Sequence, residues 1–408
     1  MKKIIFIFIF TAFLTNYINA QWVLTNDTIW HDVEAFSDNG NYLFAAVPSD
    51  GVYKTSNNGL TWSLFNVKIN ARTANCIAAK NNMVFLATDT GLYKSTNNGN
   101  NWFIVDNLIG NYIEAVTVAE SFLFIGKYDG IFRSDNWGTN WVMVNNEIQW
   151  HYHDVRYFAY SNNNLYVALD SIPYHLRIYK SINFGNNWSL ISQDIPSWNI
   201  PYSLYASDNL LLCGTSLGIY ESLNYGANWS LINGIPVNIG LFGYATSGTK
   251  NIFISTWGYG NFYVSNNYGQ TWNIKNEGLG GGFSTAVYKF GDYLFLSCGA
   301  IFRRPINELV GIRNISSNIP DKYYLYQNYP NPFNPSTNIK FQIKESKFVT
   351  LKIFDILGKE ISTLVNEKQS PGTYEVSFDG SNLSSGIYFY SLFSDGRLID
   401  TKKFMLLK

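Results

Sequence analysis

One eight-residue motif recurs along most of this chain of 408 residues and constrains its fold more than any other feature. Each copy begins with Ser or Thr, has Asn at its third position and Gly at its fifth, and ends with Thr or Asn followed by Trp. A unit that returns at intervals of about 40 residues indicates a repeat architecture, in which neighbouring units bury each other's apolar faces. The copies span 55–62, 95–102, 134–141, 181–188, 222–229 and 265–272.

The residue types of the motif suit a tight connection between two antiparallel strands. We expect the Asn side chain, for example Asn97, to accept hydrogen bonds from backbone amides two residues further on. Gly99 follows two residues later, where the backbone needs a positive φ that glycine adopts at little cost. Trp102 then begins the next strand and packs against a neighbouring unit.

Each repeat contains four short apolar segments, which predicts a four-stranded propeller blade. In the second repeat these segments begin near Cys76 and continue with 83–87, 91–94 and 102–105. After the sixth motif three more strands follow, without a motif or Trp. We therefore expect 21–24, at the other end of the chain, to supply the missing strand and to close an all-β, seven-bladed β-propeller over residues 21–308. One Trp marks each blade: Trp22, Trp62, Trp102, Trp141, Trp188, Trp229 and Trp272.

The motif resembles the Asp-box, also called the BNR or sialidase-type repeat, with Asn where many families have Asp. Sialidases need three convergent arginines, and their propellers have six blades. Arg303 and Arg133 occupy the repeat position of Lys54, Lys94 and Lys180, so both have a structural explanation. Xyloglucanases and endoglucanases of this type use two tandem propellers around a cleft, whereas one is predicted here. The single seven-bladed form is more similar to the photosystem II stability and assembly factor group, which are binding scaffolds.

The N-terminus has the pattern of a secretory signal peptide over residues 1–20. Lys2 and Lys3 precede an apolar run, 4–14, that is too short to span a membrane. We expect cleavage before Gln21 and no membrane span in the mature chain.

The composition disfavours several classes of partner. The formal net charge is zero, and no basic run stands out that would favour nucleic acid or an anionic membrane surface. Cys76, Cys213 and Cys298 fall in predicted strands of different repeats, and we expect them to be free and buried. No metal or other cofactor is predicted.

The repeats stop before a predicted linker, 309–322, and a second domain, 323–408. This domain has a Pro-rich stretch, 329–337, then alternating strands at 339–343 and 349–353, and a basic end. It resembles the type A C-terminal sorting domain of the type IX (Por) secretion system. The resemblance implies a small Ig-like β-sandwich that engages the type IX secretion machinery. It also implies export through the periplasm to the extracellular space or the outer-membrane surface.

The connections of an up-and-down blade alternate between the two faces of the ring. We expect the motifs on one face and most exposed aromatic residues on the other, where rings and scattered polar groups suit a glycan or a surface protein. Glu34, Glu114, Arg156 and Tyr202 occupy equivalent positions near the central channel. His153 is equivalent to His31, and each is followed by Asp. The candidate binding residues are Trp30, Glu34, Glu114, Trp150, His153, Arg156, Trp198, Tyr202 and Trp257.

The predicted function is therefore a secreted or surface-displayed, non-catalytic binding propeller for a glycan or a protein. The alternative is a glycoside hydrolase similar to xyloglucanases or endoglucanases, with a sialidase less favoured. A glycosidase would need two carboxyl groups flanking the cleaved bond, and their separation does not follow from sequence. No catalytic residue is assigned.

Overall fold

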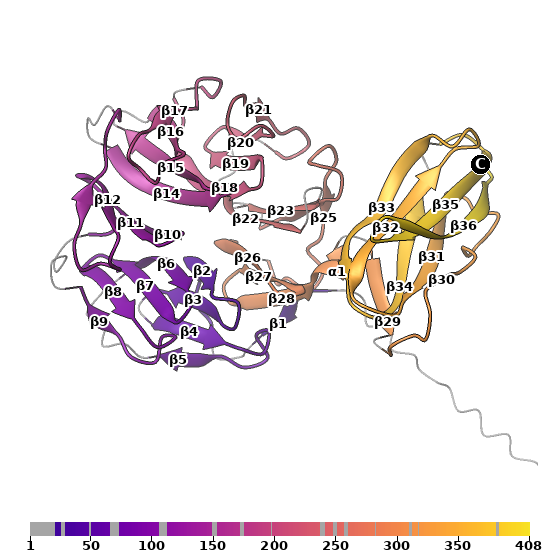
Figure 1. Cartoon of the computed structure of the whole chain (residues 1–408), viewed down its shortest axis with the longest axis horizontal. Coiled ribbons are helices and arrows are strands. Elements are labelled where there is room, and N and C mark those ends of the chain that lie inside the picture. Colours follow the sequence, from indigo (N-terminus) through magenta and orange to yellow (C-terminus); the bar gives the residue numbers. More distant parts are fainter. Residues whose placement is uncertain are drawn as a thin grey trace, which may run out of the picture.

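A computed structural model describes the chain in residues 21–25, 29–48, 50–65, 73–105, 112–148, 153–171, 175–196, 198–236, 241–247, 251–256, 260–281, 283–309, 312–316, 318–380 and 383–408. Seven four-stranded sheets form a ring, and two further four-stranded sheets form a C-terminal sandwich beside it (Figure 1). The predicted fold class, a seven-bladed propeller followed by a small sandwich, is confirmed. The predicted signal peptide, 1–20, lies outside the described residues.

The first four blades follow one another along the chain, and each has its strands in sequential order. Blade 1 consists of β2 (Ala35–Asp38), β3 (Leu43–Val47), β4 (Gly51–Thr55) and β5 (Ser63–Phe65). Blade 2 consists of β6 (Ala74–Lys80), β7 (Met83–Thr88), β8 (Gly91–Ser95) and β9 (Phe103–Ile104). Blade 3 consists of β10 (Ala115–Ala119), β11 (Phe122–Lys127), β12 (Gly130–Ser134) and β13 (Val142–Met143). Blade 4 consists of β14 (His153–Ser161), β15 (Asn164–Ser171), β16 (His175–Ser181) and β17 (Ser189–Leu190).

The last three blades include the one that closes the ring. Blade 5 consists of β18 (Pro201–Ser207), β19 (Leu210–Thr215), β20 (Gly218–Ser222) and β21 (Ser230–Leu231). Blade 6 consists of β22 (Leu241–Ser247), β23 (Asn251–Thr256), β24 (Phe262–Ser265) and β25 (Asn273–Ile274). Blade 7 consists of β26 (Ala286–Phe290), β27 (Tyr293–Ser297), β28 (Ile301–Pro305) and, from the N-terminus, β1 (Val23–Leu24).

The N-terminal strand closes the ring as predicted. β1 pairs antiparallel with β28 through Val23 with Arg303 and Leu24 with Phe302. Trp22, only 2% exposed, anchors this strand: its Nε1 donates to the carbonyl of Lys275 at 2.8 Å, and its ring packs edge-on against Phe262. Pairing the first and last strands of the propeller segment removes the open sheet edge that a linear array of blades would leave at blade 7.

The first strands of the blades, β2, β6, β10, β14, β18, β22 and β26, contact one another in a closed circle and form the inner wall of the ring. The turns between first and second strands lie beside the repeated eight-residue motifs, since Asn209 Nδ2 donates to the carbonyl of Leu223 at 2.6 Å. We name this side the box face. On the other side, Asp32, before a first strand, accepts from the amide of Gly299, between a second and a third strand. We name that side the opposite face.

The motif forms a hydrogen-bonded turn that differs in one respect from the prediction. In the second copy, Ser95 Oγ accepts from the amide of Gly99 at 2.9 Å, and Asn97 Oδ1 accepts from the amide of Asn101 at 2.8 Å. The Asn bond thus reaches four residues on rather than two, because the serine hydroxyl takes the intervening amide. Gly99 has φ of 77°, as expected, and Asn98 before it is also left-handed at 56°.

Basic side chains at the end of the third strands link each of five blades to the next one. Lys94 Nζ, for example, donates at 2.8 Å to the carbonyl of Trp137, the left-handed residue of the next motif. We name these contacts the inter-blade clamps. Glu221 in blade 5 and Val264 in blade 6 occupy the equivalent position, so the junctions from blade 5 to 6 and from 6 to 7 have no clamp of this kind. The clamps run from Lys54 to Asn98, Lys94 to Trp137, Arg133 to Phe184, Lys180 to Tyr225 and Arg303 to Asn58.

The C-terminal domain is a sandwich of two antiparallel sheets that follows the short helix α1 (Ile306–Leu309). The predicted strands 339–343 and 349–353 lie inside two of its strands, Ser336–Ile343 and Lys347–Phe354. The first sheet has the order β29-β34-β31-β30, with β29 (Ile312–Ser316), β30 (Tyr324–Leu325), β31 (Ser336–Ile343) and β34 (Gly372–Asp379). The second has the order β33-β32-β35-β36, with β32 (Lys347–Phe354), β33 (Glu360–Gln369), β35 (Gly386–Ser394) and β36 (Arg397–Leu406).

The predicted linker, 309–322, is wrong over part of its length. Ile312–Ser316 forms strand β29, which pairs antiparallel with β34 and extends the sandwich by one edge strand. The segment satisfies its backbone groups, and covers the edge of β34, by joining the sheet. Within the described residues, no helix is long and apolar enough to span a membrane.

Candidate functional site

The predicted equivalent residues near the channel share a single backbone position on the opposite face. In blades 2, 4 and 5 this position is a β-bulge, occupied by Asn75, Arg156 and Tyr202 respectively. In blades 1 and 3 it is held by Glu34 and Glu114, whose amides each donate at 3.0 Å to the second strand. A bulge re-aims the side chain of its extra residue. The blades thus present different side chains at one equivalent backbone position around the rim of the channel.

Arg156 is the centre of a charged cluster on this rim. Its Nη1 lies 2.6 Å from Glu114 Oε1, and its Nη2 lies 3.3 Å from Asp154 Oδ2 and 3.6 Å from Asp170 Oδ2. We name these four residues the Arg156 cluster. It joins blade 3 to both strands of the first hairpin of blade 4. One guanidinium faces three carboxylates, so the cluster carries a local excess of negative charge.

The burial of these groups perturbs their titration. Desolvation raises the pKa of Glu114, an effect that the nearby Arg156 partly offsets. Desolvation likewise raises the pKa of Asp170 against the attraction of Arg156. Glu34 has a raised pKa because of desolvation and the neighbouring Asp32. Carboxyl groups that hold their protons more tightly are typical of binding and catalytic sites, but ion-pair networks produce the same effect.

Two of the predicted tryptophans lie on the opposite face and are well exposed. Trp30 has 63% of its surface accessible, and Trp198 has 67%. Trp30 precedes His31, whose Nε2 lies 3.9 Å from Asp50 in the turn between second and third strands. Trp198 precedes Asn199, whose Oδ1 accepts at 2.8 Å from Ser216 in the corresponding turn of blade 5. Neither indole is part of the buried core. The two tryptophans lie in different parts of the ring, Trp30 at blade 1 and Trp198 at blade 5.

The remaining predicted residues differ in what the structure says of them. Trp150 and Trp257 lie outside the described residues. His153 begins β14, and only its backbone pairing with Ser171 is described. Tyr202 is half-buried. The part of the chain that the structure describes contains no group of three or more His, Cys, Asp or Glu residues placed to hold a metal ion.

The cysteines are all free, and Cys213 and Cys298 are buried as expected. Cys76 is only half-buried, and its Sγ lies 3.4 Å from the carbonyl of Val116 in blade 3.

Sequence reasoning missed Asp170 and the aromatic Phe283. Asp170 pairs with Asp154 across the first hairpin of blade 4, so its place follows from the strand register rather than from the motif. The sequence signal that could have identified Asp170 is a carboxylate near the end of an otherwise apolar second strand, 165–171. Phe283, 52% exposed, lies just before the first strand of blade 7, where the other exposed aromatics of this face also precede first strands.

The comparisons with known proteins agree with this architecture. Residues 327–407 match the family described as the secretion system C-terminal sorting domain. The match indicates export by the type IX system to the cell surface or extracellular space, and contact with its machinery. No curated protein matches the chain.

Solved propellers of two kinds resemble the chain. YCF48 bound to D1 peptide is 14% identical with a TM-score of 0.56, over 71% of this chain and 98% of that chain. The GH74 enzyme of Niastella koreensis is 15% identical with a TM-score of 0.57, over 94% of this chain and 67% of that chain. The GH74 xyloglucanase of Xanthomonas campestris is 14% identical with a TM-score of 0.56, over 79% of this chain and 59% of that chain. At these identities the likeness concerns the fold alone.

Proposed function

We propose that this protein is an exported, non-catalytic binding propeller that holds an extended, positively charged polypeptide on its opposite face. The observation that carries the proposal is the Arg156 cluster, in which three carboxylates share one guanidinium on the face that also carries the exposed aromatic residues. Local excess negative charge attracts a cationic partner, and Trp faces bind Lys and Arg side chains through cation–π contacts.

The distribution of the exposed rings favours an extended ligand over a small one. Trp198 lies on blade 5, Phe283 on blade 7 and Trp30 on blade 1, so these rings follow an arc of the ring rather than a single pocket. An extended chain that crosses this arc can contact all three, whereas a small molecule cannot. The structure of YCF48 was solved with a bound peptide, and the match to this chain covers 98% of YCF48. This similarity supports the same interpretation.

A glycoside hydrolase remains the second candidate because GH74 enzymes resemble the chain. Glu114, Asp154 and Asp170 each face the same guanidinium, which reduces their freedom to act as an acid and a nucleophile on a sugar. The chain spans only 59% and 67% of the two GH74 proteins compared.

The test is a binding screen of the chain from Gln21 onward against basic, neutral and acidic peptides, xyloglucan and β-glucans. We expect saturable binding of basic peptides that weakens with added salt. Trp198→Ala should weaken binding roughly 30-fold, as for the loss of an interface tryptophan worth about 2 kcal/mol. Glu34→Gln, which removes one rim charge, should weaken binding less and reduce its salt dependence.

Phe103→Ala is the matched control, because Phe103 is a half-exposed aromatic on the outermost strand of blade 2. It should leave binding unchanged. Binding to polysaccharides without binding to basic peptides would overturn the polypeptide assignment. Release of sugar from xyloglucan or β-glucan, lost in Glu114→Gln, would establish the hydrolase instead.

A further inference from the structure

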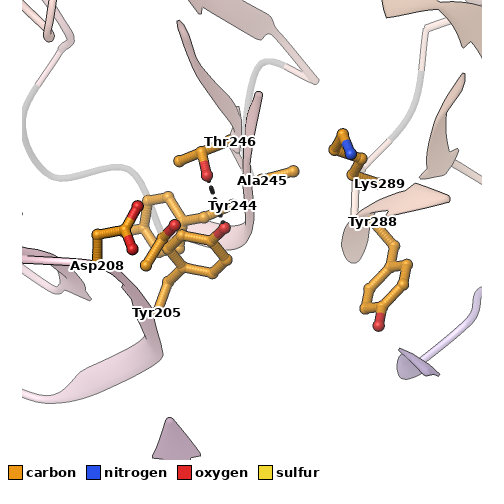
Figure 2. A pocket seen from close by; sticks show the side chains of 8 residues that line it. Tyr205, Asp208, Tyr244, Ala245, Thr246, Tyr288 and Lys289 are labelled. Carbon is orange, nitrogen blue, oxygen red and sulfur yellow. Dashed lines mark hydrogen bonds between the residues drawn. The ribbon is translucent and has the colours of Figure 1, made fainter. Parts of the chain in front are cut away.

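A separate cavity opens between blades 5, 6 and 7, at the inner wall of the ring (Figure 2). Its volume is about 380 Å³, and its walls come from β18, β22 and β26 together with the turn after β18. Small-molecule sites have volumes of about 300–1,000 Å³, so the cavity has room for a small ligand.

The cavity lies at the box-face end of the channel, away from the Arg156 cluster. Asp208, on its wall, belongs to the turn between first and second strands of blade 5. The neighbouring Asn209 donates to Leu223 in the motif of the same blade, which places this turn on the box face. A ligand here would therefore be independent of the polypeptide proposed for the opposite face.

An alanine between two tyrosines creates the cavity. Tyr205, Ala245 and Tyr288 hold the same register position in adjacent blades, paired with Leu212, Phe253 and Phe295 respectively. The small side chain of Ala245 leaves open the space that a third ring would fill. The cavity also lies where the two inter-blade clamps are missing, since blades 5, 6 and 7 are joined without them.

The aromatic walls are held in place by hydrogen bonds. Tyr205 Oη lies 2.8 Å from Thr246 Oγ1, and Tyr288 Oη donates to Asp38 Oδ2 at 2.9 Å. Tyr244, 94% buried, contributes the edge of a third ring. Fixed rings offer a ligand apolar contact area with little loss of side-chain entropy.

Two side chains of opposite charge, Asp208 and Lys289, lie on opposite walls of the cavity. Figure 2 shows Asp208 beside Tyr205 on one side and Lys289 beside Tyr288 on the other. The two do not form an ion pair, and both side chains are exposed. Asp208 Oδ1 accepts one hydrogen bond, from Asn162 at 3.3 Å. Among the ion pairs of the described residues, none includes Lys289.

We infer that this cavity binds a small zwitterion of the size of an amino acid or dipeptide. Its amino group would lie toward Asp208 and its carboxylate toward Lys289, with an apolar side chain between the rings of Tyr205 and Tyr288. A molecule with one charge of each sign matches both walls at once, whereas an anion or a cation alone would leave one wall charge unpaired. Charge complementarity of this kind provides specificity and orientation.

The test is calorimetric titration of the chain from Gln21 onward with the dipeptide Ala-Phe, compared with N-acetyl-Ala-Phe and with Ala-Phe amide. We expect saturable binding of Ala-Phe, weakened at least about tenfold by capping either end. Lys289→Met and Asp208→Asn should each weaken the uncapped dipeptide to a similar extent. Ala245→Leu, which fills the cavity and leaves both charges, should abolish binding.

The matched controls are Asp292→Asn and Lys359→Met. Asp292 is an exposed carboxylate in the equivalent turn of blade 7, and Lys359 is an exposed lysine of the sandwich. Both should bind Ala-Phe as the parent chain does. Equal binding of capped and uncapped forms, unchanged binding in Lys289→Met, or no saturation up to about 10 mM would each overturn the inference. Because Lys289 and Asp208 are exposed, their variants will fold even if Ala245→Leu does not.

Discussion

Replacing Lys94 by Met tests whether the inter-blade clamps stabilise the ring. Lys94 Nζ donates at 2.8 Å to the carbonyl of Trp137 and lies 5.9 Å from the ring centroid of Phe85. Met keeps most of the apolar stem and removes the charge and the donor. A hydrogen bond to a charged group contributes about 1.5–3 kcal/mol net. Desolvation lowers the pKa of Lys94, so burial offsets part of the gain and we expect a loss near 1.5 kcal/mol.

The assay is urea unfolding followed by tryptophan fluorescence. All 12 tryptophans precede residue 273, so the fluorescence reports on the propeller and not on the sandwich. Lys94→Arg is the matched variant, since Arg133 and Arg303 make the same contact in other blades, and it should cost less than about 0.5 kcal/mol. A neutral Lys94→Met, or a Lys94→Arg that is as destabilising as Lys94→Met, would show that the clamp does not stabilise the ring.

Three further predictions concern ring closure, the missing clamp and the sandwich. Trp22→Ala should destabilise the propeller by about 3–5 kcal/mol, because it removes the buried ring and the hydrogen bond to Lys275 that hold β1. A decrease in the free energy of unfolding below about 1 kcal/mol, in the same urea assay, would contradict this role. Glu221→Gln should stabilise the propeller by about 0.5–1.5 kcal/mol at pH 7. Burial raises the pKa of Glu221, and its unpaired Oε2 lies beside the motif of blade 6. The side-chain amide of the new Gln carries no charge and can donate a hydrogen bond to this motif, as Lys94 does to the motif of blade 3. A raised carboxyl pKa destabilises the ionised folded state, so this advantage should shrink as the pH falls below the folded pKa; an advantage that is constant between pH 4 and pH 8 would refute the explanation. Tyr390→Phe should destabilise the sandwich by about 1–3 kcal/mol, because the Tyr390 hydroxyl donates to the carbonyl of Tyr326 and accepts from the amide of Asn328. Thermal unfolding followed by circular dichroism measures this change, and an unchanged midpoint would exclude it.

The fold followed from local sequence because its repeat is local. The Ser, Asn and Gly of each motif form their turn with partners no more than four residues away, so the pattern alone predicts the connection and the count of blades. The missing strand at the end of the repeats likewise identified β1 as the closing strand. Basic residues at one repeat position were visible too, but their acceptors in the next blade were not. Four of the clamps join residues 43 to 51 positions apart, and the fifth joins Arg303 to Asn58, which lie 245 positions apart.

The binding surfaces depended on contacts that sequence order does not reveal. Alignment of the repeats placed Glu114 and Arg156 at one level of the rim, but only the pairing of β14 with β15 brought Asp170 to the same guanidinium. The edge strand β29 was mistaken for a linker because its partner, β34, lies some 60 residues further along the chain. The cavity beside Ala245 arose from a small residue between two tyrosines of other blades. Local patterns determined the turns and strands, whereas the closure of seven blades into a ring decided which side chains meet at its centre.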